Sequence, residues 1–536
     1  MASGVDELLT AWVREEWERQ PTQASALGAD GYDHRLGDFS SSAFEQRPER
    51  DRHYAGLVER LSLPELPVDE RVDLVAVLAE LAGRQVMDDW QLWRREPAVY
   101  LGPCLGGVHE PWLHRLRPEP ELVDGTVARL AEIPGVLADA RANLDPALMP
   151  ALFARRGEAR ARAGARYIAA SLPGEASDPE QRDRLAAATA APVSALEAFA
   201  DWLAEVGPRA AGDWAIGEAR YSALLTGREL LGVDAAGLHQ RGVAAFDQLD
   251  AQMAEVAARI DPRASGWPEV LAALDADCPD TPEEMRAAYE RSCDEARAFL
   301  IERDLVTLPE GERCLVEPSP LYQRPVLAVA SYQSPPPLSP SLTGHFFVPY
   351  PPDGERPEAI RERLANNGYH AVPTTAVHEA YPGHHWQLVW SRRTTRLVRH
   401  LVTTSYFVEG WALYAEAMMH EQGFFTDDRQ VLSHLGARIF RAARIVVDTA
   451  LHTGAMTVAE AESFMRDRAG LPGAVARAEV ERYCSWPTQA ASYLTGCLQI
   501  EELRSRWTGD LRAFHDSLAA NPGLPVALAA ELLLAG

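Results

Sequence analysis

The sequence contains no lysine, so arginine supplies all 52 basic side chains among its 536 residues. This absence excludes a P-loop, whose lysine contacts nucleotide phosphates, and any enzyme that forms a Schiff base on a lysine amine. An excess of positive charge is lacking too, because 78 acidic residues give the chain a formal net charge of −26 at pH 7. Binding to nucleic acid or to an anionic membrane surface is therefore not expected.

Cysteines and long apolar runs are also scarce. The six cysteines are scattered and form no Cys-x-x-Cys pair, which favours free thiols in a reducing compartment. No run of about eighteen apolar residues occurs, so we expect no membrane-spanning helix. Residues 1–17 include Asp6, Glu7, Glu15 and Glu16 and do not resemble a signal peptide. These features together favour a cytoplasmic protein.

Most of the chain has the periodicity of amphipathic helices, with apolar residues at three- and four-residue steps. The clearest stretches are residues 6–17, 68–93, 155–172, 183–206 and 235–260. Capping boxes that begin at Thr281 and Thr457 mark the starts of two further helices. The pattern predicts a mainly-α protein.

Residues 313–352 depart from the helical pattern. They contain β-branched and aromatic runs at 314–316, 326–332 and 345–350, with several prolines between them. Proline beside such runs is typical of edge strands. We therefore predict a small, exposed antiparallel sheet in this region.

The strongest chemical signal lies at residues 378–385, which read HEAYPGHH. The segment begins like the zinc motif His-Glu-x-x-His, in which two histidines one helical turn apart bind the metal and the glutamate is the general base. Four residues after His378 stands Pro382, which cannot bind metal, so the second histidine must be His384 or His385. Proline followed by glycine predicts a kink that brings one of the two back toward His378. The spacing leaves the choice between them open.

A third ligand is expected from a helix over residues 404–422. Glu409 follows His385 by 24 residues, which leaves room for one helix to end and the next to return antiparallel. Glu416 lies seven residues further on the same helical face, where it would orient a ligand histidine or lie on the surface. Two histidines, one glutamate and an open position for water suit a catalytic zinc site, although such ligands also suit iron(II) or manganese.

Three segments resemble the bacterial family called domain of unknown function 885. They are residues 377–385 (VHEAYPGHH), residues 407–412 (FVEGWA) and residues 482–493, and the resemblance extends over most of the chain. One departure is Thr488, which stands where the family usually has glycine. The family is similar to helical zinc metallopeptidases such as thimet oligopeptidase, angiotensin-converting enzyme and carboxypeptidase Taq. This resemblance implies a two-lobed helical fold with a deep cleft, in which an edge strand of a small sheet holds an extended peptide.

The resemblance also implies roles for single residues. With one zinc per chain, Glu379 takes a proton from the attacking water and passes it to the leaving amine. A tyrosine from a late helix donates a hydrogen bond to the developing oxyanion in those peptidases. Tyr493 is the first candidate for this tyrosine and Tyr483 the second.

We therefore predict a metallohydrolase with three parts: an N-terminal helical lobe over residues 1–312, a β insert over 313–352 that lines the cleft, and a C-terminal helical lobe over 353–536 that carries the metal. Its expected substrates are small peptides or related amides. Two alternatives stay open, namely a metalloenzyme acting on a non-peptide amide or small metabolite in secondary metabolism, and a catalytically inactive binding scaffold. The sequence does not indicate the oligomeric state.

Overall fold

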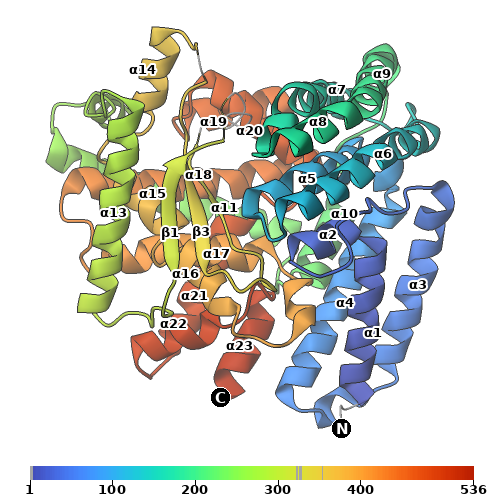
Figure 1. Cartoon of the computed structure of the whole chain (residues 1–536). Helices are drawn as coiled ribbons and strands as arrows, with labels where there is room; N and C mark the ends of the chain where they lie inside the picture. Colours follow the sequence, from blue (N-terminus) through green and yellow to red (C-terminus); the bar gives the residue numbers. More distant parts are fainter. Residues whose placement is uncertain (1–3, 321–323, 325–328, 353, 536) are drawn as a thin grey trace. The chain divides into compact units, whose positions relative to one another are not determined.

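The structure is a computed structural model that describes residues 4–320, 324, 329–352 and 354–535. Helices make up most of it, and the described strands form one small sheet, as Figure 1 shows. The mainly-α prediction is confirmed. Within the described residues, no helix combines the length and the apolar character that crossing a membrane requires.

The chain forms two compact units. The first comprises Met1–Ile216 together with Pro336–Pro340, and the second comprises Gly217–Pro335 together with Ser341–Gly536. Both boundaries of the three-part division expected from the sequence fall inside the second unit. The sheet and the helices on either side of it in the sequence therefore belong to one unit.

The first unit is helical. Its α-helices are α1 (Gly4–Arg19), α2 (Pro21–Ala26), α3 (Ser41–Glu59), α4 (Val68–Asp89), α5 (Ala98–His114), α6 (Glu119–Asn143), α7 (Ala151–Arg166), α8 (Pro179–Ala188) and α9 (Ala190–Val206). Their apolar faces pack against one another, with α7 against α9 and α5 against α6 as prominent pairs. The apolar periodicity of the sequence produces these buried faces.

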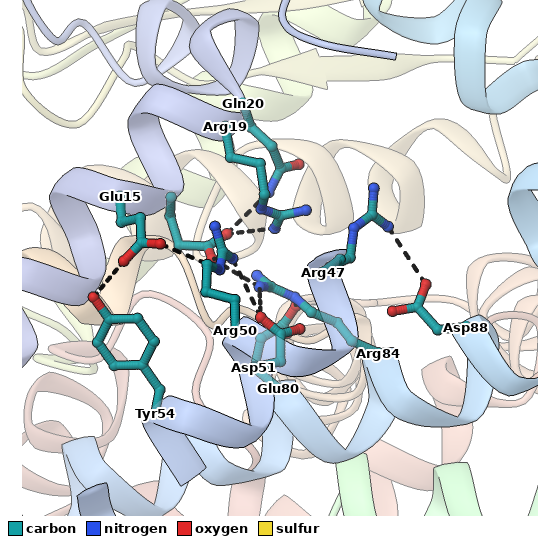
Figure 2. Close-up of polar contacts among 11 residues, drawn as sticks. Glu15, Arg19, Gln20, Arg47, Arg50, Asp51, Tyr54, Glu80, Arg84 and Asp88 are labelled. Atoms are coloured by element: carbon teal, nitrogen blue, oxygen red, sulfur yellow. Dashed lines mark hydrogen bonds and ion pairs between the residues drawn. The ribbon is translucent and has the colours of Figure 1, made fainter. Parts of the chain in front are cut away.

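A buried charge network joins three helices of the first unit. Glu16 on α1 lies 2.5 Å from Arg19, 2.5 Å from Arg50 on α3 and 2.9 Å from Arg84 on α4. Figure 2 shows these three arginines converging from their helices. Burial raises the pKa of Glu16, but the arginines outweigh it and lower the pKa to about 2. The carboxylate therefore stays ionised and paired, which is the condition under which a buried charge is tolerated.

The second unit contains the remaining helices and the sheet. Its α-helices are α10 (Glu218–Ala223), α11 (Ala235–Ile260), α12 (Trp267–Leu274), α13 (Pro282–Glu302), α14 (Pro357–Ala365), α15 (Val372–Glu379), α16 (His384–Ser391), α17 (Ser405–Glu421), α18 (Asp428–Thr453), α19 (Val458–Asp467), α20 (Gly473–Ser485), α21 (Ser492–Ser505), α22 (Leu511–Ala519) and α23 (Val526–Ala535). The long helices α11 and α18 pack against each other, and so do α17 and α21.

Two helices of this unit start at the predicted caps. The side chain of Thr281 accepts a hydrogen bond from the backbone N–H of Glu284, but Glu284 in return accepts from Asp280 and not from Thr281. At Thr457 and Glu460 both halves of the capping box are present. The first backbone N–H groups of a helix need acceptors, and threonine and glutamate side chains supply them. Helix starts can therefore be predicted from these residue types in the sequence.

The sheet consists of β1 (Arg313–Pro318), β2 (Ser331–Gln333) and β3 (Thr343–Val348) in the order β1-β3-β2. β2 pairs antiparallel with β3, whereas β1 pairs parallel with β3. The prediction of an antiparallel sheet is therefore wrong for one of its two pairings. A parallel pairing needs a crossover of a dozen or more residues, and the long segment between β1 and β3 supplies it. Of the predicted strand at 326–332, residues 326–328 lie outside the described residues.

Two glycines let α17 and α21 touch backbone to backbone. A Cβ atom added to Gly496 would lie 1.7 Å from the carbonyl oxygen of Tyr406, and one added to Gly410 would lie 2.6 Å from Gly496. No larger residue fits at either position without moving the helices apart. This contact fixes the distance between the helix that carries Glu409 and the helix that carries Tyr493.

Candidate metal centre

A break between α15 and α16 shapes the centre. α15 ends at Glu379 and α16 begins at His384, so the predicted interruption of the helix is confirmed. The N–H of Gly383 donates to the carbonyl of Val377 at 3.0 Å. A Cβ on Gly383 would lie 1.9 Å from the carbonyl oxygen of His378, so the chain can return this closely only at glycine. The break brings the start of α16 back to the last turn of α15.

Three predicted ligands converge at this break. The rings of His378 and His384 stand perpendicular with their centroids 4.8 Å apart. Their Nε2 atoms lie 3.7 Å and 3.3 Å, respectively, from Oε2 of Glu409 on α17. One ligand atom from each of the three residues lies within 4.8 Å of the others. We call His378, His384 and Glu409 the triad.

The triad fits a divalent metal ion. Ligands of a tetrahedral zinc ion lie about 3.4 Å apart, given bonds of about 2.0–2.1 Å, and the separations of the two histidines from Glu409 are close to this value. Oε2 of Glu409 is buried and has no hydrogen-bond partner within the described residues. Burial raises the pKa of Glu409, but His378 and His384 outweigh it and hold the pKa well below its usual range. An ionised carboxylate facing two imidazoles is a suitable ligand set for zinc. Either a proton or a metal ion can lie between the carboxylate and the imidazoles.

His385 lies outside the triad and is removed from the candidate ligands. Its Nε2 lies 2.8 Å from Glu312, and its Nδ1 lies 2.9 Å from the hydroxyl of Tyr332 on β2. The hydroxyl of Tyr381 donates to the same carboxylate of Glu312 at 2.6 Å. Consecutive residues of a helix point about 100° apart. When His384 faces the triad, His385 must therefore face a different neighbour, which is the sheet side of the unit.

Glu416 contacts His378 through the ring nitrogen that does not face Glu409. It is fully buried, and its Oε1 lies 2.7 Å from Nδ1 of His378 while its Oε2 lies 3.5 Å from Nδ1 of His434. Burial raises the pKa of Glu416, but the two histidines lower it to about 2. Burial likewise lowers the pKa of His378, but Glu409 and Glu416 raise it to about 9. Glu416 thus stays ionised and turns Nε2 of His378 toward Glu409.

Glu379 adjoins the triad on the last turn of α15. The pKa of Glu379 is raised, chiefly by burial and also by the charge of Glu409. The charges of His378, His384 and Arg441 act in the opposite direction. Glu379 directly follows His378 in the chain, as the last residue of α15. A carboxyl group next to metal ligands is suited to accepting and returning a proton.

The two candidate tyrosines have different surroundings. Tyr493 lies at the start of α21, and its pKa is raised first by burial and then by the charge of Glu409. The guanidinium carbon of Arg444 lies 4.6 Å from the centroid of its ring. Tyr483 is fully buried, and its hydroxyl donates to Glu479 at 2.7 Å. The structure brings Tyr493 toward the triad and commits the hydroxyl of Tyr483 to another carboxylate.

The turn before α21 contains Thr488. Its φ of 71° lies in the left-handed region, which glycine enters without strain and a β-branched residue does not. Its N–H donates to Asp448 at 3.1 Å, and its carbonyl accepts from the hydroxyl of Tyr406 at 3.1 Å. Asp448 also accepts from the hydroxyl of Tyr221 at 2.5 Å. These contacts hold the turn that leads into Tyr493.

His434, Arg441 and Asp448, all on α18, lie around the candidate site, and the sequence reasoning missed them. His434 and Arg441 are seven residues apart, as are Glu409 and Glu416 on α17. This spacing places each pair on one face of its helix. The signal is present in the sequence but is too common on helices to identify a site without the contacts.

The fold and the site together define a mainly helical protein with a candidate metal centre, formed by two histidines and one glutamate that are buried or partly buried. The chain belongs to the bacterial protein family of unknown function DUF885, whose model matches residues 21–533. This finding confirms the family resemblance drawn from the three sequence segments. No curated protein is significantly similar to the chain.

Two solved structures share the fold. One is described as a "putative lipoprotein of unknown function" from Shewanella oneidensis, with a TM-score of 0.80, 21% identity and coverage of 99% of this chain and 100% of that one. The other is described as a "putative lipoprotein" from Colwellia psychrerythraea, with a TM-score of 0.80, 18% identity and coverage of 99% and 98%. At these identities the likeness shows the fold alone.

The descriptions of these two structures contradict the cytoplasmic location that the sequence favours. Both are described as lipoproteins, a description that does not fit a cytoplasmic protein. The prediction relied on composition, on scattered cysteines and on the absence of a long apolar run. A lipid anchor needs no membrane-spanning helix and leaves the composition of the folded part unchanged. These sequence features therefore do not distinguish a lipid-anchored protein from a cytoplasmic one.

Proposed function

We propose that this protein is a zinc-dependent hydrolase that cleaves peptide or related amide bonds of small substrates. The observation that carries the proposal is the convergence of His378, His384 and Glu409 at the α15–α16 break, with Glu379 beside them. Two histidines and one glutamate leave a fourth position of a tetrahedral metal ion open, which is the arrangement of catalytic zinc sites. The same proposal includes a two-lobed fold in which the substrate binds in a deep cleft, as in helical zinc metallopeptidases.

The residues around the triad have the properties that amide hydrolysis requires. A divalent metal, when bound, polarises the substrate carbonyl and lowers the pKa of a water molecule. Glu379 accepts a proton from the attacking water and returns it to the leaving nitrogen. Tyr493 donates a hydrogen bond to the carbonyl oxygen as negative charge develops there.

The sheet favours a peptide over other amides. In the part of the sheet that the structure describes, β1 pairs with β3 on one side only, so its other edge has no neighbouring strand. An extended peptide can pair with such an edge through its main-chain N–H and C=O groups. The network of His385, Glu312 and Tyr332 connects β1 and β2 to the start of α16, which carries His384.

The proposal is tested by metal content and hydrolysis in matched variants. Protein purified without chelator or nickel affinity is expected to contain about one zinc ion per chain, and His378→Ala is expected to lose it. Glu379→Gln should keep the metal but lower kcat on a peptide library at least about 100-fold. Glu358→Gln, at an exposed position on α14, is the matched control.

Three results would contradict the proposal. They are an absence of bound metal even after zinc is added, iron in place of zinc, and unchanged hydrolysis in Glu379→Gln. Loss of turnover on peptides together with retained turnover on non-peptide amides would favour the alternative substrate class. A protein that binds zinc but hydrolyses neither class would instead be a binding scaffold.

A further inference from the structure

A cavity of about 800 Å³ lies in the first unit and shares no residue with the triad. Its walls come from α1, from the segment before α3 and from α3 itself. Three arginines line it, namely Arg19 on α1 and Arg47 and Arg50 on α3. Figure 2 shows the three guanidinium groups together with the carboxylates beside them. A small ligand in this cavity would therefore meet several cationic donors.

Arg47 is the least satisfied of the three arginines. Arg50 donates to Glu16 at 2.5 Å, and Arg19 donates to the same carboxylate at 2.5 Å. Arg47 makes no hydrogen bond to any residue that the structure describes, and its one ion pair there, with Asp88, spans 3.6 Å. A guanidinium group has five N–H donors, so Arg47 has donors available for a ligand.

The ring of Phe44 holds the guanidinium group of Arg47 in place. The guanidinium carbon lies 4.7 Å from the ring centroid, and Phe44 is itself buried and stacked on Trp93. Such a contact attracts the cation without giving its N–H groups an acceptor. The side chain of Arg47 keeps 25% of its surface exposed. The group is thus fixed, accessible and short of acceptors.

The other two arginines of the cavity also have donors without acceptors. The Nε atoms of Arg19, Arg47 and Arg50 are buried, and none of them has a hydrogen-bond partner among the described residues. The pKa of Arg19 is lowered to about 10, chiefly by burial and also by the charges of Arg84 and Arg47. Glu16 acts in the opposite direction. An anionic group bound here would supply acceptors and reduce the repulsion between the cations.

Carboxylates without cationic partners line the outer part of the same cavity. Asp38 and Glu49 belong to its lining, and both residues are exposed. Within the described ranges, neither has a basic group at ion-pair distance, although Asp38 accepts from the N–H of Ser40 at 2.9 Å. With Glu15, three carboxylates and three arginines line the cavity, and the net charge of −26 on the chain disfavours a polyanion. The cavity therefore suits a ligand that carries one anionic and one cationic group.

We propose that this cavity binds a free amino acid, with its carboxylate on Arg47 and its ammonium group toward Asp38 and Glu49. A guanidinium group pairs with a carboxylate through two parallel hydrogen bonds. The single charge of Arg47 matches a carboxylate better than a phosphate monoester, which carries nearly two negative charges. This inference goes beyond the proposed hydrolase function and does not depend on it.

The test measures binding of amino acids to the full-length protein. The common amino acids are screened by their effect on thermal unfolding, and calorimetry gives the Kd of the one that binds most tightly. Its N-acetyl derivative and its amide should each bind at least about 10-fold more weakly, because each lacks one of the two charges.

Variants of α3 place the ligand in the cavity. Arg47→Met should weaken binding of the amino acid at least about 10-fold, and Arg47→Lys should weaken it less, because the charge remains. Arg52→Met is the matched control, since Arg52 is an exposed arginine on the same helix that does not line the cavity. It should bind with the wild-type Kd.

A second pair of variants tests the cationic end of the ligand. The double variant with Asp38→Asn and Glu49→Gln should no longer prefer the amino acid over its N-acetyl derivative. Both positions are exposed, so folding should be unaffected. A preference as strong as in the wild-type protein would show that the ammonium group binds elsewhere and would contradict the proposed orientation.

Several results would overturn the inference. They are a lack of binding by every amino acid tested, equal Kd values for the amino acid and its two derivatives, and tighter binding of inorganic phosphate or phosphoethanolamine. An unchanged Kd in both Arg47→Met and Arg47→Lys would also overturn it. Thermal unfolding checks that the variants fold, and Arg47→Lys serves alone if Arg47→Met is unstable.

A variant of the triad separates this cavity from the candidate metal centre. His378→Ala should bind the amino acid with the wild-type Kd, because His378 belongs to the second unit and does not line the cavity. Loss of binding in His378→Ala would mean that the amino acid binds at the metal centre as a product of hydrolysis, and it would overturn the inference. The comparison is valid whether or not the protein hydrolyses peptides.

Discussion

Oε1 of Glu416 accepts a hydrogen bond from Nδ1 of His378 at 2.7 Å, and this contact decides which nitrogen of the imidazole faces the rest of the triad. With Nδ1 bound by the carboxylate, Nε2 is left to point at Glu409. A histidine that binds metal through one nitrogen is usually held through the other in this way. The contact is long-range in sequence, since it joins α15 to the middle of α17.

The first prediction concerns metal affinity. Glu416→Gln is expected to weaken zinc binding about 10- to 100-fold, because the amide can no longer hold His378 with a full negative charge. The Kd for zinc, measured by competition with a chelating dye, checks this. Glu421→Gln, at an exposed position on the same helix, should bind zinc like the wild-type protein. An unchanged Kd in Glu416→Gln would show that Glu416 is only a structural carboxylate.

The second prediction concerns the dependence of stability on pH. Burial raises the pKa of Asp448 from 3.8 to about 7, although Tyr221 and the N–H of Thr488 oppose the rise. Since the folded-state pKa is raised, the neutral carboxyl favours folding, and this contribution is complete below about pH 4 and lost as the pH rises through about 7. Asp448→Asn, which cannot ionise, should therefore gain stability relative to wild type on going from pH 5 to pH 8.

Each pH unit between the two pKa values is worth about 1.4 kcal/mol, and about two such units lie between pH 5 and the folded-state pKa, so the relative gain from pH 5 to pH 8 should be about 3 kcal/mol. Urea denaturation of both proteins at pH 5, 6.5 and 8 measures it. Parallel pH profiles for wild type and Asp448→Asn would mean that Asp448 keeps an ordinary pKa in the folded protein.

The third prediction concerns the left-handed turn at Thr488. Glycine adopts a φ of 71° without strain, whereas alanine keeps the clash of its Cβ with the backbone. Thr488→Gly is therefore expected to be more stable than Thr488→Ala by about 1 kcal/mol. The free energies of unfolding in urea give the comparison. Equal stability of the two variants would show that the turn relaxes to a different conformation.

The fourth prediction concerns the contact of α17 with α21. Gly496→Ala should lower the free energy of unfolding by at least about 2 kcal/mol, because the added methyl group meets the backbone at Tyr406. Thermal or chemical unfolding checks this. Gly473→Ala, at the start of α20 with open space around it, should be neutral or slightly stabilising and serves as the control. Similar stabilities in the two variants would contradict the tight contact.

Local features were readable from the sequence. Helical periodicity and two capping residues predict helices where α1, α4, α13 and α19 form. The Pro-Gly step predicts the break after Glu379, and proline-flanked aromatic runs locate the sheet. These signals are local because each depends on the conformational preference of a few neighbouring residues. The three family segments depend on contiguous residues as well, and the family is confirmed.

Tertiary structure decided the rest. Whether His384 or His385 joins Glu409 depends on the rotation of α16 against α17, which no neighbouring residue fixes. The parallel pairing of β1 with β3 depends on the route of the segment between them.

The turn at Thr488 shows the same division. The sequence marks an unusual residue at a glycine position, but the contacts that hold it come from Asp448, forty residues away, and from Tyr406, further still. The sequence by itself thus determined the helices, the place of the sheet, the family and a short list of ligands. Only the folded chain brought His384 and not His385 to Glu409 and placed Glu416 against His378, because hydrogen bonds and charges act between residues that packing brings together, whatever their separation along the chain.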